Sequence, residues 1–347
     1  MTSNERTLNL YPIDYPFETL VARIKASPPK TILDPDFQRK YKWDEEGWQR
    51  ASKFIESCLM RIPLPSCYFA ENESGHHLVI DGVQRLTTIK RFFDDEFALE
   101  GMTAFDDLEG KRFSELGDYR SELESTTIRC IVLRKDNPKS IIREIFSRLN
   151  QGAVRLSDQE IRHAIFPGSL DALLEELGQA PEIARFGLAK DSTSAKTSRE
   201  PDEQVLRFFA FSEDHDLSKY GGVLSAYLDA FMADNQCIDA DRVSALRTKF
   251  TGALDNCRLI FGERMFTKAS AERPRQGLVY YDLLMPTVGL LDRELVTSKQ
   301  SKIRAAFERL CDAPEFTRTL SGGLQNKSSI IKRREIWSML LREALDK

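Results

Sequence analysis

The residues best suited to chemistry in this sequence lie in one short stretch, where a carboxylate, a glycine, an amide and an arginine occur close together. Asp81 and Gly82 follow a run of branched apolar residues, and Gln84 and Arg85 come next. Glycine accepts the backbone angles of a tight turn. A helix that begins after such a turn offers free N–H groups and a positive dipole end to an anion. With the charge of Arg85 beside it, the stretch predicts an anion site, most naturally for phosphate.

A strand and a helix must position this turn. The branched run Leu78–Ile80 predicts the end of a buried strand, and Leu86 and Ile89 begin an apolar repeat at helical spacing. An ordinary strand–helix turn explains the same residues, with Asp81 as the helix cap and Arg85 in a surface ion pair. Because Arg85 lies opposite the apolar repeat, we expect its removal to weaken anion binding and to leave thermal stability nearly unchanged.

The composition is that of an ordinary globular protein of about two domains. The chain has 347 residues, 41% of them hydrophobic and 30% charged, and a net charge of -4. Without an overall basic excess, any contact with nucleic acid must come from a local patch. Six cysteines are scattered without a CxxC pair, which indicates reduced thiols. The adjacent His76 and His77 lack the spacing of a zinc site. No apolar run reaches membrane-spanning length, so we expect a cytoplasmic protein with no membrane partner.

The order of the predicted elements indicates an α+β fold. Residues 1–16 read as an irregular lead-in, and short strands and helices then alternate. Strands are expected at 66–71, 76–81 and 127–133, and helices near 17–24, 48–62 and 139–149. From Asp202 onward the periodicity is almost wholly helical. The sequence therefore predicts a domain with a small mixed sheet at 1–168 and an all-helical domain at 169–347, with a polar loop at about 189–201.

Five motifs occur in order along the first part of the chain. They are Phe37-Gln38-Arg39-x-x-x-Trp43, Ile62-Pro63-Leu64-Pro65, Ile80-Asp81-Gly82-Val83-Gln84-Arg85, Arg148-Leu149-Asn150-x-Gly152 and Leu156-Ser157-x-Gln159-Glu160-x-Arg162. Together they resemble the N-terminal domain family of GmrSD-type modification-dependent restriction enzymes, of the ParB/sulfiredoxin-like superfamily. The resemblance extends over about residues 15–235, because Arg199-Glu200 and the segment after it are similar to the family's helical extension. It implies a ParB/sulfiredoxin-like fold for the first domain.

The resemblance implies a nucleotide-binding protein, with NTP hydrolysis, in a prokaryotic restriction or antiphage defence system. Asp81, Gln84 and Arg85 are the expected catalytic residues: Asp81 would hold Mg²⁺ through water, Gln84 would orient a water, and Arg85 would contact phosphate. The other expected nucleotide- or phosphate-binding residues are Gln38, Arg39, Gly82, Thr87, Thr88, Arg148 and Asn150. Each also has a structural explanation, such as a helix cap, a surface amide or an arginine–carboxylate pair.

Two departures from the family pattern modify this expectation. The family's usual turn is Asp-Gly-Gln-Gln-Arg, and Val83 replaces its first glutamine, so we expect weak NTP hydrolysis. No histidine follows His215, so the C-terminal HNH nuclease domain of many family members is not expected, nor is DNA cleavage by this chain alone.

Two other classes of function stay open beside the NTPase. One is a DNA-binding protein that keeps the fold without hydrolysis, and a basic cluster near the C-terminus would support it. This cluster consists of Lys327, Lys332, Arg333 and Arg334, and a solvated helix face explains it equally well. The other is an interaction subunit for a separately encoded nuclease or defence protein. DNA, such a subunit and a second copy of the chain are therefore the macromolecular partners under consideration.

Overall fold

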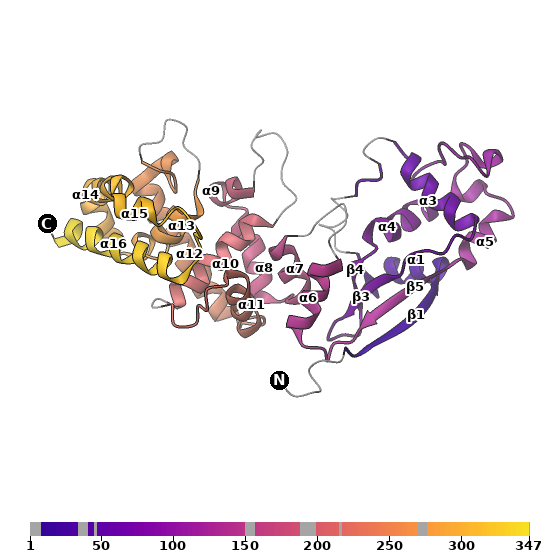
Figure 1. The fold of residues 1–347 in the computed structure, drawn as a ribbon, viewed down its shortest axis with the longest axis horizontal. Helices are drawn as coiled ribbons and strands as arrows, with labels where there is room; N and C mark the ends of the chain where they lie inside the picture. Colours follow the sequence, from indigo (N-terminus) through magenta and orange to yellow (C-terminus); the bar gives the residue numbers. More distant parts are fainter. Residues whose placement is uncertain are drawn as a thin grey trace. The chain divides into compact units, whose positions relative to one another are not determined.

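The computed structural model describes residues 8–33, 41–44, 47–149, 157–187, 199–214, 217–269 and 276–346 (Figure 1). The chain divides into two compact units, Met1–Leu156 and Ser157–Lys347. Helix α7 (Asp158–Ile165), which the sequence prediction placed in the first domain, contacts α10 and α11 of the second unit. The structural division therefore comes before α7.

The N-terminal unit contains a mixed sheet of five strands in the order β1-β5-β3-β4-β2, as the predicted α+β class requires (Figure 1). The strands are β1 (Leu10–Pro16), β2 (Thr31–Ile32), β3 (Cys67–Glu71), β4 (His77–Asp81) and β5 (Thr127–Leu133). Strand β3 is parallel to β5 and antiparallel to β4, β1 is antiparallel to β5, and β2 is parallel to β4. The small mixed sheet predicted from the sequence is thus confirmed.

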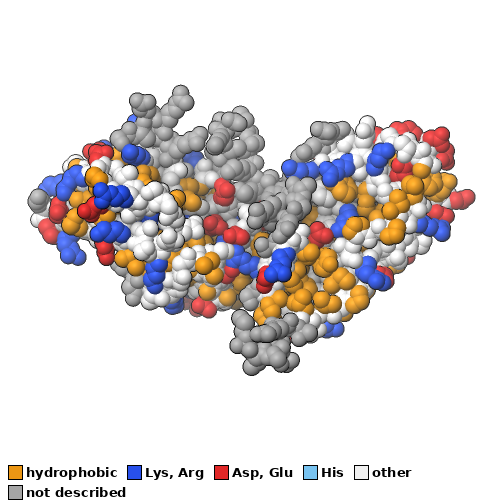
Figure 2. All heavy atoms as spheres, in the orientation of Figure 1, with side chains coloured by type: hydrophobic (Ala, Val, Ile, Leu, Met, Phe, Trp, Pro, Cys, Tyr) orange, Lys and Arg blue, Asp and Glu red, His pale blue; other side chains and the backbone are white. Residues whose placement is uncertain are grey.

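Strand β1 was not predicted, because its two prolines resemble those of an irregular segment. The Phe17 N–H donates to the Thr126 carbonyl at 2.9 Å, which shows which residue pairs of β1 and β5 are hydrogen-bonded and which are not. Pro12 and Pro16 belong to the pairs that are not hydrogen-bonded, so their backbone nitrogens point toward the free edge of the sheet. Proline is tolerated there because it has no N–H to leave unpaired, and it protects the edge from further pairing. Figure 2 shows hydrophobic side chains gathered over this part of the unit.

Four helices of the N-terminal unit share one core with the sheet. They are α1 (Phe17–Lys25), α3 (Gln49–Leu59), α4 (Val83–Phe93) and α5 (Tyr119–Ser125), with short 3₁₀ helices at Asp106–Leu108 and Phe113–Glu115. Helix α6 (Lys139–Leu149) contacts β4, but its buried residues do not belong to this core. Leu86, Ile89 and Phe92 of α4 are fully buried against this core. Phe93, at the end of the helix, stacks on Phe113 with ring centroids 4.1 Å apart. The apolar face of α4 therefore fixes which of its side chains point outward.

The C-terminal unit is helical in its described part, as predicted. After α7 it contains α8 (Ser169–Gly178), α9 (Pro181–Ala184), a 3₁₀ helix (Arg185–Gly187), α10 (Glu200–Glu213), α11 (Leu224–Asp234), α12 (Ala240–Phe261), a 3₁₀ helix (Gly262–Arg264), α13 (Leu278–Leu284), a 3₁₀ helix (Val288–Leu290), α14 (Arg293–Asp312), α15 (Pro314–Arg318) and α16 (Lys327–Asp346). The capping box predicted at the start of α7 is present: the Ser157 N–H donates to the Glu160 carboxylate at 2.6 Å, and the Glu160 N–H donates to the Ser157 hydroxyl. These helices enclose a separate hydrophobic core.

Candidate functional site

The turn between β4 and α4 has the geometry that the sequence predicted. Strand β4 ends at Asp81, and Gly82 follows with φ of +100°, in the left-handed region that favours glycine. A Cβ atom at Gly82 would lie 2.3 Å from the Cys67 sulfur, so the space as well as the backbone angle excludes a larger residue. Glycine is therefore required at the residue where α4 begins.

The N-terminus of α4 is not capped by any side chain of the described residues. Asp81, which an ordinary strand–helix turn would use as the cap, instead accepts a hydrogen bond from Arg85 at 2.9 Å through its Oδ2 atom. The first N–H groups of a helix have no partner within the helix itself. They lie beside a carboxylate of which one oxygen is held by arginine.

Arg85 is held more firmly than the sequence suggested. Its guanidinium donates to the carbonyl oxygens of Pro65 and of Ser66 as well as to Asp81, and its side chain is 14% exposed. These contacts connect the segment that precedes β3 to the turn after β4. Arg85 therefore stabilises the turn, which differs from the expectation that its removal leaves thermal stability nearly unchanged.

Gln84 and Thr88 hold a neighbouring segment against α4. The Gln84 Oε1 atom accepts a hydrogen bond from the Lys42 N–H at 3.0 Å. The Thr88 hydroxyl is 2.7 Å from the Tyr41 hydroxyl and donates to the Gln84 carbonyl at 2.8 Å. Thr87 and Thr88 are both buried. Their hydroxyls thus lie inside the domain, and not at the open first turn where the sequence prediction had placed them as phosphate donors.

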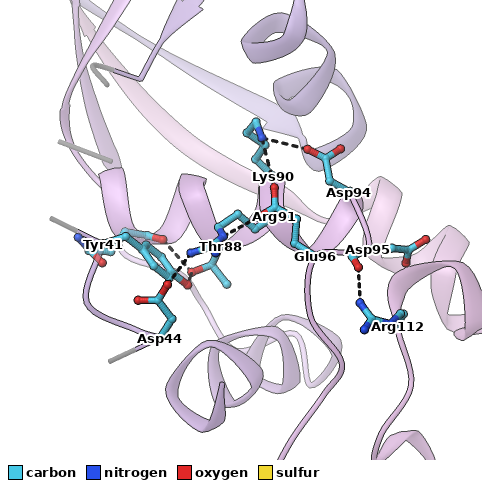
Figure 3. A network of polar contacts seen from close by, with 10 residues as sticks. Tyr41, Asp44, Thr88, Lys90, Arg91, Asp94, Asp95, Glu96 and Arg112 are labelled. Carbon is cyan, nitrogen blue, oxygen red and sulfur yellow. Dashed lines mark hydrogen bonds and ion pairs between the residues drawn. The ribbon is translucent and has the colours of Figure 1, made fainter. Parts of the chain in front are cut away.

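Arg91 continues this contact at the next turn of the helix, as Figure 3 shows. Its guanidinium lies over the rings of Tyr41 and Trp48, at 4.9 and 4.6 Å from their centroids. It also donates to Asp44 at 2.8 Å and to Glu96 at 2.7 Å. Burial beside α4 raises the pKa of Tyr41 to about 12, because it disfavours the phenolate. The sequence prediction missed Arg91. Its helical spacing from Gln84 and Thr88 places it on the same face of α4 but does not reveal these partners.

The part of the chain that contains this turn matches a known domain family. Residues 17–167 match the family described as the GmrSD restriction endonuclease, N-terminal domain. Residues 17–167 form a GmrSD-type N-terminal domain. The match confirms the resemblance found in the motifs and associates this domain with restriction systems. No curated protein and no solved structure gives a significant match to this sequence.

The remaining predicted site residues of the GmrSD-type domain are less closely connected to the turn. Arg148, near the end of α6, is 74% exposed and pairs with Glu144 on the same helix. Val83, in the first turn of α4, is half-buried and packs against the core. Gln38, Arg39 and Asn150 lie outside the described residues.

A metal site made by the protein alone and a membrane-spanning helix would each place requirements on the described residues. No group of three or more histidine, cysteine, aspartate or glutamate residues there is arranged to hold a metal ion. None of the helices described combines the length and the apolar character needed to cross a membrane. A metal at Asp81 would therefore need oxygen atoms from water or from a ligand to complete its coordination.

Proposed function

We propose that the GmrSD-type domain binds a nucleoside triphosphate at the N-terminus of α4 and hydrolyses it slowly, within a prokaryotic restriction or antiphage system. The observation that supports this most is the first turn of α4, which begins at Gly82 with φ of +100° and carries Arg85 beside Asp81. Backbone N–H groups at such a turn bind phosphate oxygens, and the helix dipole favours their negative charge. DNA or a separately encoded nuclease would be the partner in that system.

The side chains around the turn suit distinct tasks in this reaction. The Asp81 oxygen that does not bind Arg85 would hold Mg²⁺ through water, and Arg85 would keep that carboxylate in place. The Gln84 Oε1 atom now accepts a hydrogen bond from the Lys42 N–H. When that bond is released, the Gln84 amide would orient the attacking water. Gln38, Arg39, Arg148 and Asn150 stay predicted phosphate ligands. We leave Thr87 and Thr88 out of the site because they are buried. The Val83 side chain cannot donate or accept a hydrogen bond, unlike the glutamine that the family usually has at this position, and we expect slow turnover for that reason.

The DNA-binding alternative loses its supporting basic cluster. Arg333 is buried and donates to the Thr319 carbonyl at 3.0 Å, and its pKa is lowered because burial disfavours the charged form. Arg334 lies over the Phe211 ring at 5.2 Å. Two of the four cations predicted to form the cluster therefore serve internal packing in the C-terminal unit. This observation favours the nucleotide proposal over direct phosphate-backbone contact at the C-terminus.

A thermal-denaturation series with the full chain tests the proposal. Each of the four NTPs is added with and without Mg²⁺, at about 100 times its dissociation constant. A ligand that binds only the folded state should then raise the free energy of unfolding by about 2.7 kcal/mol. Phosphate release measured on the same samples should be slow, and Gln84→Ala should reduce it further. Gln179→Ala, an exposed amide of the C-terminal unit, serves as the control. Melting that no NTP changes would contradict the proposal.

A further inference from the structure

A pocket of about 360 Å³ opens between the C-terminal ends of α3 and α5. Leu59, Arg61, Ile62 and Leu64 line it on one side, and Glu122 and Thr127 line it on the other. No residue of the Asp81–Arg85 turn belongs to its lining. The pocket is thus distinct from the nucleotide site proposed above, although its wall continues directly into the Pro65–Ser66 segment that Arg85 binds.

Arg61 at the rim of this pocket has a strained backbone. Its φ is +56°, and the bonds Arg61 N–H to Cys58 O and Ile62 N–H to Ser57 O, both 3.0 Å, form a Schellman motif at the end of α3. That position favours glycine, because a side chain in the left-handed region is disfavoured. The Arg61 side chain is nevertheless 80% exposed, and it meets Glu122 at 3.6 Å, beyond hydrogen-bond distance. Strain at an exposed cation beside a cavity indicates a function for the side chain.

The opposite wall of the pocket is rich in hydrogen-bond acceptors. The Thr126 hydroxyl donates to the Glu122 carbonyl at 2.8 Å, and the Ser125 hydroxyl donates to the Ser121 carbonyl at 2.9 Å. With their protons used in this way, both hydroxyls have only lone pairs left for a ligand. Glu122 adds a carboxylate. A ligand with N–H donors can therefore hydrogen-bond to these acceptors.

The other wall is apolar and partly open. Leu59 and Leu64 contribute to the core of the unit, and Ile62 is an exposed large hydrophobic residue. Pro63 between them has no N–H, so it adds no donor to the cavity. A flat ring could pack against this surface while its polar edge faces the acceptors across the pocket. The cavity therefore combines an apolar wall, an acceptor wall and a single cation at the rim.

We infer that this pocket binds one nucleotide unit, either free or as part of a nucleic acid strand. The base packs on Leu59, Ile62 and Leu64, and its exocyclic amino group donates to Glu122 and to the neighbouring hydroxyls. The phosphate stays at the rim, where Arg61 pairs with it. Adenine, cytosine and guanine carry an exocyclic amino group, and uracil does not. The pocket should therefore prefer the first three. This inference does not depend on NTP binding at α4.

Equilibrium binding of AMP, CMP, GMP and UMP to the full chain, without Mg²⁺, tests the pocket. At least one amino-bearing nucleotide should bind about tenfold or more tightly than UMP, because one hydrogen bond to a charged group is lost with uracil. A short single strand of the preferred nucleotide, compared with the monophosphate, shows which source of the nucleotide binds better. Equal binding of UMP, or binding of none of the four, would overturn the inference.

Arg61→Gly separates this function from a structural role. Glycine relieves the strained backbone, so the variant should melt at a higher temperature and yet bind the preferred nucleotide about tenfold or more weakly. Asp95→Gly is the matched control, since Asp95 has φ of +55° after α4 and does not line the pocket, and its dissociation constant should equal that of the wild type. Gln84→Ala should also bind the monophosphate normally, which separates this pocket from the NTP site. Wild-type binding by Arg61→Gly would contradict the role of Arg61.

Discussion

Arg85 and Arg91 lie on the same helix, and both fold back onto the domain rather than extending into solvent. Arg85 binds two backbone carbonyls and Asp81, and Arg91 lies over two aromatic rings and binds two carboxylates. The contacts of Arg85 with Pro65 and Ser66 cannot be read from helical spacing, because these partners come from a segment distant in the sequence. The same holds for the contacts of Arg91 with Tyr41, Asp44 and Trp48. An arginine on the polar side of a helix is therefore compatible with both a ligand contact and a structural one until the tertiary partners are known.

The first prediction at this scale concerns the stability that Arg85 provides. Arg85→Ala should lower the free energy of unfolding by about 1–3 kcal/mol, because it leaves the Pro65 and Ser66 carbonyls and the Asp81 carboxylate without their donor. Arg148→Ala is the control, since an exposed pair within one helix contributes about 0.3–0.5 kcal/mol. Chemical denaturation of both variants measures the difference. If the two variants are equally stable, Arg85 is a surface cation, as the sequence alone suggested.

At the scale of elements, one face of α4 organises the candidate site. Gln84, Thr88 and Arg91 follow each other at helical spacing, and all three contact the segment from Tyr41 to Asp44. This segment begins two residues after Arg39 in the sequence. Two motifs that are some 40 residues apart thus belong to one structural unit. Their joint occurrence has a physical reason, because the helix face holds the segment in which the first motif ends.

The same elements show what the sequence could and could not predict. Strand β4, the Gly82 turn and α4 were predicted because burial leaves a periodic apolar pattern and the turn needs glycine. Strand β1 was missed because it exists by pairing with β5, and pairing leaves no local pattern when prolines occupy the free edge. The polar contacts of Thr88 and Arg91 were missed for a related reason, since side-chain hydrogen bonds between distant segments have no sequence period.

The prediction at this scale is that Arg91 attaches the Tyr41–Asp44 segment to α4. Arg91→Ala should lower the free energy of unfolding by about 1–3 kcal/mol, because the cation lies over two rings and binds Asp44. Lys90→Ala, which removes the neighbouring cation and its contact with Asp94, should cost less than about 1 kcal/mol. Urea denaturation followed by tryptophan fluorescence reports on Trp43 and Trp48 beside this segment. Equal losses in the two variants would show that the segment is held elsewhere.

At the scale of the whole molecule, each unit has its own hydrophobic core, so we expect the stability of each unit to depend on pH in its own way. One core gathers the sheet with the helices packed on it, and the other gathers the helices from α7 onward. Arg162 of the C-terminal unit is fully buried and binds both Glu203 and Asp229. The arginines of the α4 site, Arg85 and Arg91, are more exposed than Arg162. The C-terminal unit is consequently the part of the chain whose stability should respond most to its own ionisable groups.

Asp202 gives the clearest case of such a response. It lies near the start of α10, where Arg199 donates to it at 2.8 Å, and a Cβ atom at Gly178 would lie 2.5 Å from its Oδ1 atom. Burial raises its pKa to about 6, because the charged form loses its hydration, and Arg199 opposes this shift only in part. A carboxyl group whose pKa is raised by folding contributes stability that is fully present below its unfolded value and is lost as the pH rises through the folded value. The unfolded value is 3.8, so this loss falls between about pH 4 and pH 6.

Asp202→Asn removes this titration and should therefore change the pH profile of the C-terminal unit. Between pH 4 and pH 7 the free energy of unfolding of the variant should rise relative to wild type by up to about 3 kcal/mol. Glu176→Gln is a control of opposite sign, because Arg247 lowers the pKa of Glu176 and the stability from that pair is lost as the pH falls. Guanidinium denaturation at several pH values, followed by helical circular dichroism, measures both profiles. Parallel profiles for wild type and Asp202→Asn would show that Asp202 ionises at the same pH in the folded and the unfolded chain.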